Sequence, residues 1–432
     1  MNDQRWPSRS RALGDDVITV DGERLWRSLM DLARIGAYTD ERTGLVGVNR
    51  LALTDADAAA RRQVIRWMEE AGLSVRIDAV GNVYGRRSGS DPTAAPVMLG
   101  SHVDSVATAG AFDGCLGVLG GIEVVRRFDE LELGTTRPVE VAFFTEEEGV
   151  RFRTDMLGSA VAVGRVPVDR ALALTDRDGT SLGAELARHG FDGPDDPLLA
   201  PPHAYLECHI EQGPVLAAAD QEIGVVTGVQ GISWQEVTID GRAGHAGATP
   251  TEQRADAGLA ASRTVVHLRA MADSGEFGAL RATVGGLHLH PGLPNVVPSR
   301  ATFTVDLRNP DDAAMDRAEA ALAAFLRGLE DEHDGRLTAT VERLALTRAV
   351  DFDDDLQAAI ATAADDLGYR HQSLRSGAGH DAQELAHIGR AAMIFVPGEH
   401  EGISHNPREY STPDACRRGI DVLATVAARL AR

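Results

Sequence analysis

Short apolar runs of strand length alternate along this chain with segments in which apolar residues recur every three or four positions. The runs at 95–100, 138–145, 204–210 and 391–397 are strand candidates of this kind. The segment 115–131, whose small residues permit close packing, is typical of a helix. Strands that alternate with helices predict an α/β fold, with a central sheet flanked by helices on both faces.

The order of the predicted elements changes between about residues 229 and 343. There the pattern predicts a strand, a helix, two strands, a helix and a strand, which is the β-α-β-β-α-β order of a ferredoxin-like unit. We therefore expect residues 229–343 to form a small inserted domain, with residues 1–228 and 344–432 as the two parts of a larger one. A chain of 432 residues is long enough for both.

Composition excludes several classes of function. The formal charge of −22 argues against nucleic acid and anionic membranes as partners, and it is compatible with a site that collects cations. The chain has no lysine, which excludes Schiff-base chemistry and the P-loop lysine. Cys115, Cys208 and Cys416 are too widely spaced for a disulfide framework or a zinc pair. Residues 1–16 lack the apolar core of a signal peptide, and we expect a soluble, cytoplasmic protein.

Residues that can bind a metal stand at or after the ends of the predicted strands. They are His102, Asp104, Asp113, the triplet Glu146–Glu148, His209 and His405. In an open α/β sheet, ligands bind beyond the carboxyl ends of the strands, so these side chains can converge. Histidine and carboxylate ligands suit zinc, cobalt, nickel or manganese. The candidates outnumber the ligands of one open site and a carboxylate can bridge two ions, so we expect a two-metal site.

A series of motifs follows in order: GSHVDSVATAGAFDGCLGV, TEEEGVRF, LECHIEQGPVL, GRAGHAGATP, LPNVVP with TVDLR, SGAGHDA and GISHNP. This series resembles that of the M20-type metal-dependent amidohydrolases. HIEQGP together with EEEG-x-RF most resembles the branch of N-carbamoyl-L-amino-acid hydrolases, β-ureidopropionases and allantoate amidohydrolases. The resemblance extends from about residue 20 to 430.

The resemblance implies a role for each matched residue of the metal site. It implies that His102 and His209 bind a first divalent ion, that Glu148 and His405 bind a second, and that Asp113 bridges the two. Asp104 would orient His102. Glu147 would be the general base that takes a proton from the water between the metals.

The resemblance also implies substrate contacts. Asn295 and Arg308 would bind the α-carboxylate, for which the planar guanidinium is well suited, and Gln212 and Gly377 would line the same pocket. His245 would reach the active site of the neighbouring subunit and donate a hydrogen bond to the tetrahedral oxyanion, so that activity requires a homodimer. We therefore expect the inserted domain to serve as a lid and dimerisation unit.

Three adjacent carboxylates repel one another, so the triplet needs an explanation. On an extended backbone, neighbouring side chains point in opposite directions, and a turn after the strand is needed to aim both Glu147 and Glu148 at the metals. We expect Glu146 to be a structural hydrogen-bond acceptor, with Arg151 and Arg153 close enough to neutralise it.

The expected reaction is hydrolysis of the carbamoyl C–N bond of an N-carbamoyl-L-amino acid, which yields the amino acid, ammonia and carbon dioxide. Hydrolysis of allantoate or ureidoglycolate, in purine-nitrogen catabolism, is the main alternative. An aminoacylase or dipeptidase is disfavoured by HIEQGP, and a non-catalytic metal-binding homologue is disfavoured by the presence of Glu147. The loop at Gly398–Gly402 is about one residue longer than is usual in the family, and we expect it to affect substrate choice.

Overall fold

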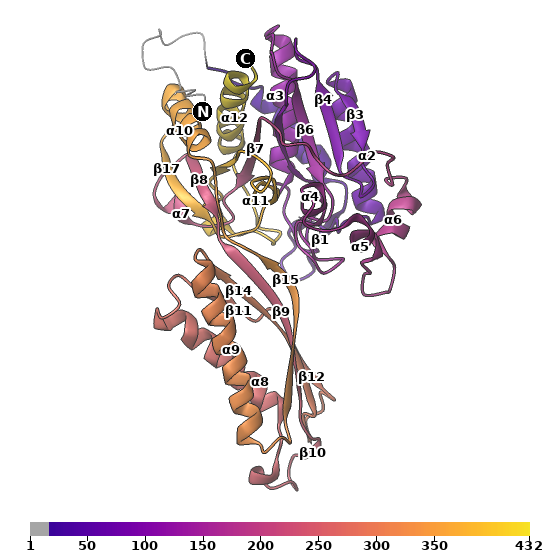
Figure 1. The fold of residues 1–432 in the computed structure, drawn as a ribbon, viewed down its shortest axis with the longest axis vertical. Helices are drawn as coiled ribbons and strands as arrows, with labels where there is room; N and C mark the ends of the chain where they lie inside the picture. Colours follow the sequence, from indigo (N-terminus) through magenta and orange to yellow (C-terminus); the bar gives the residue numbers. More distant parts are fainter. Residues whose placement is uncertain (1–16) are drawn as a thin grey trace.

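A computed structural model of the chain describes residues 17–432, so the N-terminal stretch without a predicted signal core lies outside the described part. Figure 1 shows a larger lobe, to which both ends of the described chain belong, and a narrower lobe built from the segment between strands β8 (Ile223–Val229) and β16 (Val350–Asp351). The chain leaves the larger lobe once and returns to it once.

The larger lobe is built on a mixed nine-stranded sheet. Its central strands run parallel to one another and are β18 (Ala391–Val396), β7 (Ala204–Ile210), β5 (Val97–His102) and β6 (Val139–Phe144). All their residues are buried, as is usual for parallel strands that are covered on both faces. The outer strands are β16, β8 and β17 (His371–Ser376) on one side, and β4 (Val83–Arg87) and β3 (Ser74–Ile77) on the other. The predicted α/β class is confirmed.

Helices cover both faces of this sheet. On β7, Cys208 faces α12, since a Cβ at Gly419 of that helix would lie 2.8 Å from its sulfur. The adjacent Glu207 faces α11, because it accepts a hydrogen bond from the Ala382 amide at 2.9 Å. The elements of this lobe outside the sheet are α1 (Gly22–Ala33), β1 (Ala37–Thr39), β2 (Val46–Val48), α2 (Asp55–Glu70), α3 (Cys115–Glu130), α4 (Leu157–Ala162), α5 (Val168–Ala173), α6 (Leu182–His189), α7 (Val215–Ala218), α10 (Asp354–Leu367), α11 (Asp381–Leu385), η2 (His400–Gly402) and α12 (Pro413–Ala431). Within residues 17–432, no helix is long and apolar enough to cross a membrane.

The narrower lobe has its own five-stranded antiparallel sheet, in the order β11-β14-β9-β15, with β12 also paired to β14. Its elements are β9 (Gly231–Asp240), β10 (Gly244–His245), η1 (Thr251–Gln253), α8 (Ala257–Ser274), β11 (Arg281–Thr283), β12 (Leu287–His290), β13 (Val296–Val297), β14 (Arg300–Asn309), α9 (Asp312–Glu332) and β15 (Thr338–Thr347). The second strand of the predicted unit, expected over residues 280–289, is divided into β11 and β12, with Gly285 and Gly286 between them.

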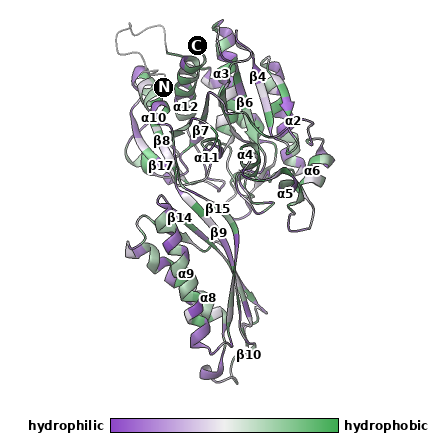
Figure 2. Ribbon diagram, in the orientation of Figure 1, coloured by the Kyte–Doolittle hydropathy of each residue, from purple (hydrophilic) through white to green (hydrophobic). Residues whose placement is uncertain are grey.

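Helices α8 and α9 pack on this second sheet. The buried side of α9 carries Met315, Leu322, Leu326 and Leu329, which recur at helical spacing, and the opposite side is polar. Figure 2 shows these hydrophobic and hydrophilic bands along α9. The buried apolar residues of the narrower lobe form a cluster separate from that of the larger lobe, so each lobe has a core of its own.

Candidate metal centre and active site

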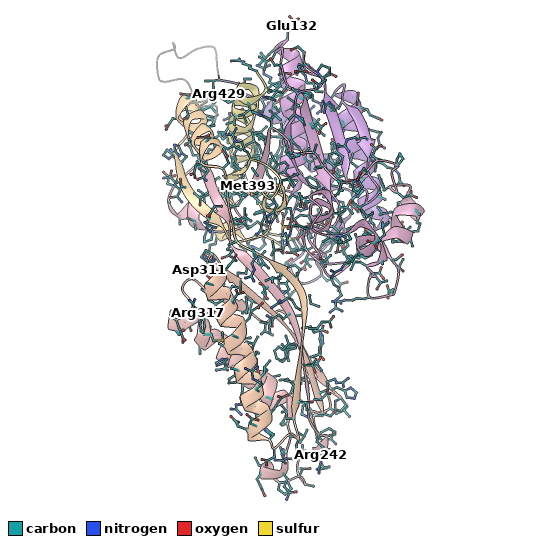
Figure 3. The ribbon with its side chains drawn as sticks, viewed as in Figure 1. Glu132, Arg242, Asp311, Arg317, Met393 and Arg429 are labelled. Carbon is teal, nitrogen blue, oxygen red and sulfur yellow. The ribbon has the colours of Figure 1, made fainter. Side chains whose placement is uncertain are left out.

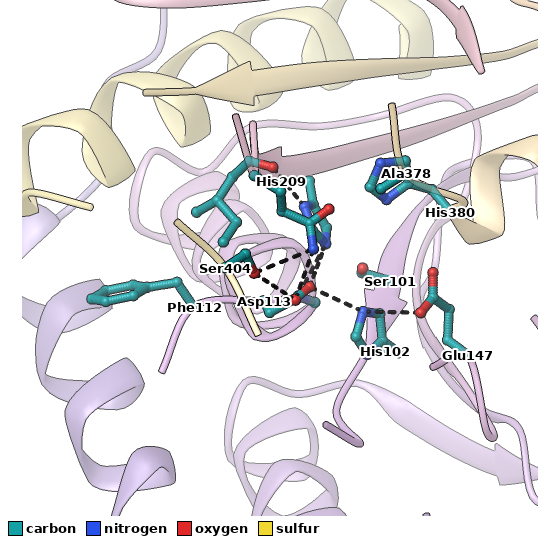
Figure 4. A network of polar contacts seen from close by, with 12 residues as sticks. Ser101, His102, Phe112, Asp113, Glu147, His209, Ala378, His380 and Ser404 are labelled. Atoms are coloured by element: carbon teal, nitrogen blue, oxygen red, sulfur yellow. Dashed lines mark hydrogen bonds and ion pairs between the residues drawn. The ribbon is translucent and has the colours of Figure 1, made fainter. Parts of the chain in front are cut away.

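The carboxyl ends of the parallel strands bring the predicted ligands together, and the close view in Figure 4 shows His102, Asp113 and His209 beside Glu147. His102 is the last residue of β5, and His209 lies near the end of β7. Glu147 and Glu148 follow β6, Asp113 precedes α3, and His405 follows β18 and η2. Residues more than 300 positions apart in sequence thus meet at one edge of the sheet.

Asp113 lies at the centre of this group. Its Oδ1 is 3.0 Å from Nε2 of His209 and 3.6 Å from Nε2 of His102, and its Oδ2 is 3.3 Å from Nε2 of His405. Two groups of potential ligands share it. They are His102, Asp113 and His209, and Asp113, Glu148 and His405, and the ligand atoms of each group lie within 4.8 Å of one another. This donor set fits divalent ions such as zinc or manganese.

Both buried histidines are oriented to offer Nε2. His102 Nδ1 lies 3.0 Å from the carbonyl oxygen of Asp104, and His209 Nδ1 lies 2.8 Å from that of Ile210. A carbonyl oxygen can only accept, so each Nδ1 carries a proton, and in the neutral ring Nε2 has the lone pair that a metal would bind. In His209 this Nε2 accepts a hydrogen bond from the Gly114 amide at 3.1 Å. Gly114 has a φ of +64°, and a Cβ there would lie 2.4 Å from His102 Nε2, so this position requires glycine.

Asp104 contacts both His102 and the turn that carries the glutamates. Its carbonyl oxygen holds the ring of His102, whereas its carboxylate Oδ1 is 3.8 Å from the same Nδ1. The carboxylate accepts hydrogen bonds from the amides of Glu147 at 3.5 Å and Glu148 at 3.4 Å. Burial raises the pKa of Asp104 to about 6. Asp104 therefore orients His102 mainly through its backbone, and its side chain fixes the glutamate turn.

Glu146 begins this turn and faces away from the ligands. Its φ is +55°, a left-handed conformation that ends the strand. Its Oε1 accepts a hydrogen bond from the Phe152 amide at 2.7 Å, as a structural acceptor does. Burial raises the pKa of Glu146 well above its usual range, and the charge of Arg151 opposes this, but both Arg151 and Arg153 form their ion pairs with other carboxylates. Their partners are Asp176 and Glu185 for Arg151, and Glu236 for Arg153.

Glu147 and Glu148 face the histidines. Oε2 of Glu147 is 3.5 Å from Nε2 of His102. Oε2 of Glu148 is 3.3 Å from Nε2 of His405, and its Oε1 accepts a hydrogen bond from the Val106 amide at 3.1 Å. The two side chains thus reach different histidines of the centre.

The electrostatics of the centre favour a cation. Burial opposes ionisation of Asp113, yet hydrogen bonds from His102, His209 and His405, when these rings also carry a proton on Nε2, hold its pKa well below the usual range. Burial also opposes the charge on His405, but Glu148 and Asp113 raise its pKa to about 11. Burial raises the pKa of Glu147 well above its usual range, against the opposing effect of His102. The surrounding carboxylates therefore attract positive charge, as a metal site requires.

Several predicted substrate residues lie beside the ligands. The pocket at the centre is lined by Asp113, Glu147, Glu148, Asp155, Met156, His209, Gln212, Ile232, Trp234, Arg308, Ala378, Gly379, His380 and His405. Gln212 Nε2 donates a hydrogen bond to Asp113 Oδ2 at 2.8 Å. Arg308 Nη1 donates to the carbonyl oxygen of Gly377 at 2.9 Å, and its Nη2 lies 2.9 Å from Asp306 Oδ2.

His245 and Asn295 lie elsewhere in the described chain. His245 ends β10, and Asn295 immediately precedes β13, the strand that pairs with β10. The Ala246 amide donates to the Asn295 carbonyl oxygen at 3.0 Å, and both His245 and Asn295 are exposed. Figure 1 places β10 at the end of the narrower lobe away from the larger lobe, and Arg242 marks the same end in Figure 3. Neither residue lines the pocket at the ligands.

The ring of His245 has a defined orientation. Its Nδ1 accepts hydrogen bonds from the amides of Gly247 and Ala248, each at 3.1 Å. The proton of a neutral ring is therefore on Nε2, which can act as a donor.

Sequence reasoning missed some residues of the centre. Ser404 Oγ lies 3.1 Å from Asp113 Oδ2 and 2.8 Å from Glu409 Oε2, and Glu409 also accepts hydrogen bonds from the amides of Phe112 and Asp113. Ser404 stands inside the GISHNP motif and could have been found there. Glu409 lies beyond that motif, and no spacing marks it.

A further group of potential ligands, Glu207, His209 and His380, shares His209 with the centre. The oxygens of Glu207 are already engaged, because they accept hydrogen bonds from Ser101 at 2.7 Å and from the Ala382 amide at 2.9 Å. We therefore interpret this group as a structural network beside the centre and not as a further metal site.

The fold and site are those of an α/β protein with a candidate metal centre at the carboxyl edge of its sheet. The chain belongs to peptidase family M20/M25/M40, since residues 98–429 match the sequence model of that family. It is 41% identical over 405 residues to the N-carbamoyl-L-amino-acid amidohydrolase of Rhizobium meliloti, and the alignment covers 94% of this chain and 95% of that protein. The resemblance to M20-type amidohydrolases is confirmed.

Other relatives agree with this family. A ureidoglycolate hydrolase of Arabidopsis thaliana is 34% identical, and the alignment covers 89% of this chain and 82% of that protein. The crystal structure of an amidase of the hydantoinase/carbamoylase family from Burkholderia vietnamiensis has a TM-score of 0.90 and 44% identity, and covers 96% of this chain and 99% of that chain.

Proposed function

We propose that this protein hydrolyses the carbamoyl C–N bond of an N-carbamoyl-L-amino acid to the amino acid, ammonia and carbon dioxide. The observation that carries the proposal is the position of Asp113, shared by two groups of ligands, with Glu147 beside them in the same pocket. The high identity to a relative named for this reaction gives the substrate class.

The centre would hold two divalent ions per subunit, drawn from zinc, manganese, cobalt and nickel. His102, Asp113 and His209 would bind one ion, and Asp113, Glu148 and His405 the other. Bound there, two such ions polarise a ureido carbonyl and lower the pKa of a nearby water. The Nε2 lone pairs of the buried histidines support this ligand set.

Glu147 is the proposed general base. Its carboxylate lines the pocket but is not needed to complete either ligand group. It would take a proton from the attacking water as the water oxygen bonds to the ureido carbon. It would then pass that proton to the leaving nitrogen as the C–N bond breaks, which releases ammonia. The remaining carbamate loses carbon dioxide to give the amino acid.

Arg308, with Gln212 and Gly377, would bind the substrate carboxylate, and their positions beside the centre support this. His245 and Asn295 would come from the second subunit of a homodimer. Their common place at the far end of the narrower lobe, and the donor at His245 Nε2, support contribution in trans.

The narrower lobe is the proposed lid and dimerisation domain. Its strand and helix order and its separate core support a ferredoxin-like unit at about residues 229–343, inserted between 1–228 and 344–432. Its surface exposes the apolar residues Leu259, Val266, Leu287 and Leu289, which favours burial against a second copy.

The three free, buried cysteines agree with a cytoplasmic location, where thiols stay reduced.

A panel assay tests the proposal. Ammonia release is measured with metal-loaded enzyme on N-carbamoyl-L-amino acids, their D-enantiomers, β-ureidopropionate, allantoate and ureidoglycolate. We expect the highest kcat/KM for an N-carbamoyl-L-amino acid. Turnover of allantoate or ureidoglycolate, with none of any N-carbamoyl amino acid, would overturn the proposal in favour of the ureidoglycolate-type relatives.

A further inference from the structure

A second cavity opens beside the metal centre. It has a volume of about 470 Å³ and includes Ser404 and His405 in its wall, so it adjoins the ligands. Its charged residues are Arg281, Arg308 and Arg375, with Glu211 as its acidic residue. A wall rich in guanidinium groups is unexpected in a chain with a net charge of −22.

Two of the three arginines are already paired with carboxylates. Arg308 makes paired contacts with Asp306, and Arg375 pairs with Asp351. Glu211 accepts hydrogen bonds from the amides at the start of α7, at 2.7 and 2.8 Å. Among the described residues 17–432, no carboxylate forms an ion pair with Arg281, whose hydrogen-bond partner is the neutral Gln230. Arg281 is therefore the arginine of this cavity whose charge is not paired with a carboxylate.

The position of Arg281 is fixed relative to Arg308. The two residues are directly opposite each other on the neighbouring antiparallel strands β11 and β14, so their side chains share a face. Arg281 Nη1 donates to Gln230 Oε1 at 2.8 Å, and Gln230 Nε2 donates to the Gly377 carbonyl oxygen at 2.7 Å. Arg308 Nη1 donates to the same carbonyl oxygen at 2.9 Å. One hydrogen-bonded chain thus holds both guanidinium groups.

Two adjacent guanidinium groups suit a ligand with two carboxylates, with that of Arg308 shared between Asp306 and the ligand. The substrate proposed above has a single obligatory carboxylate, at Cα, for which Arg308 is the partner. A side-chain carboxylate would lie a few bonds further on, within the cavity that Arg281 lines. An unpaired arginine there increases the affinity for a side chain that carries a negative charge, and does not do so for a neutral side chain of the same shape.

We propose that Arg281 is a specificity-determining residue that binds a second carboxylate, so that the preferred substrates are N-carbamoyl-L-amino acids with acidic side chains. This inference rests on the proposed function. It concerns N-carbamoyl-L-aspartate or N-carbamoyl-L-glutamate, whose neutral isosteres are the carbamoyl derivatives of asparagine and glutamine.

The experiment compares kcat/KM for each acidic substrate with that for its neutral isostere. In the unchanged enzyme we expect the acidic member of at least one pair to be favoured about tenfold or more, mainly through KM. Arg281→Gln should reduce that ratio about tenfold, and Arg281→Lys should retain part of it. The control Arg269→Gln removes a guanidinium from exposed α8, outside the cavity, and should leave the ratio unchanged.

The outcomes separate this inference from the proposed function. If the neutral isosteres are hydrolysed as well as the acidic substrates, or if Arg281→Gln leaves the ratio unchanged, Arg281 does not read a second carboxylate and the carbamoyl hydrolase stands. If no N-carbamoyl-L-amino acid of any side chain is hydrolysed, the proposed function fails and the inference fails with it.

Discussion

Glu147 and Glu148 are consecutive residues, yet their carboxylates face different histidines of the metal centre. Oε2 of Glu147 lies 3.5 Å from His102 Nε2, and Oε2 of Glu148 lies 3.3 Å from His405 Nε2. The left-handed conformation of Glu146, at φ +55°, ends the strand and makes this divergence possible. This divergence would let one carboxylate move a proton while the other binds a metal, as proposed.

Exchange of Glu147 for glutamine removes the proton acceptor and keeps the shape of the side chain. We expect Glu147→Gln to retain its bound metals and to lose at least about two orders of magnitude in kcat. Ammonia release and metal content, measured on the same preparation, check both statements. Glu146→Gln is the matched control within the triplet, because an amide oxygen can still accept the hydrogen bond from Phe152, and it should remain active. Near-normal turnover of Glu147→Gln would remove Glu147 from the role of base.

Asp113 belongs to both ligand groups, whereas Glu148 belongs to one. We therefore expect Asp113→Asn to weaken both metals together and Glu148→Gln to weaken one. Metal content after dialysis against a graded series of chelator concentrations distinguishes these patterns. Chelation of the unchanged enzyme should abolish activity, and added divalent ions should restore it. An Asp113→Asn protein with full metal content, or an active metal-free enzyme, would contradict the two-ion centre.

His245 lies at the end of the narrower lobe and cannot complete the site of its own chain in the described conformation. If it acts across a homodimer, an inactive His245→Ala subunit still has an intact metal centre, and an inactive Glu147→Gln subunit still supplies His245. We expect mixed dimers of the two to recover part of the activity, through the one site that has both residues. Co-expression with different affinity tags yields the mixed dimer, and each variant paired with itself is the control. The absence of rescue in a purified mixed dimer would count against a shared site.

The central strands could be predicted because each is a short, mainly apolar run, and their ligands because each stands at or after the end of such a run. The apolar run at 95–100 was expected to stop at Gly100, and β5 continues to His102, because strand pairing with β6 extends through the ligand itself. The roles of the ligands came from a family resemblance, since spacing alone does not say which of three adjacent glutamates faces a histidine.

Other features have no local signal. Glu409 contacts Asp113, which is almost 300 positions away in the sequence. Arg281 contacts Gln230, which is about 50 positions away. The periodicity of the sequence does not predict such long-range contacts. The ion pairs of Arg151 illustrate the same limit. Sequence proximity suggested Glu146 as its partner, but the folded chain brings Asp176 and Glu185 closer.

The pairing of Arg151 with Glu185 gives a prediction about acid stability. Glu185 Oε2 lies 2.7 Å from Arg151 Nη2, and its Oε1 lies 2.7 Å from Arg188 Nε. The hydrogen bond with Arg188, aided by Arg151 and opposed by burial, lowers the pKa of Glu185 from 4.5 to about 2. A carboxyl group with a lowered folded-state pKa stabilises the protein fully above its unfolded pKa, and this stability is lost as the pH falls toward the folded value.

We therefore expect Glu185→Gln to lower the free energy of unfolding by about 2–3 kcal/mol at neutral pH. The difference from the unchanged protein should narrow as the pH falls below about 4.5, because Glu185 itself then begins to lose its charge in the unfolded chain. Urea unfolding midpoints at a series of pH values measure this, with the exposed Glu41→Gln as control. A difference that stays constant from neutral pH down to the onset of acid unfolding would show that Glu185 acts through packing rather than through its charge. Arg151 follows Glu148 by three residues, so its ion pair with Glu185 also connects the glutamate turn to α6. If this connection supports the metal centre, Glu185→Gln should also lose metal affinity at neutral pH.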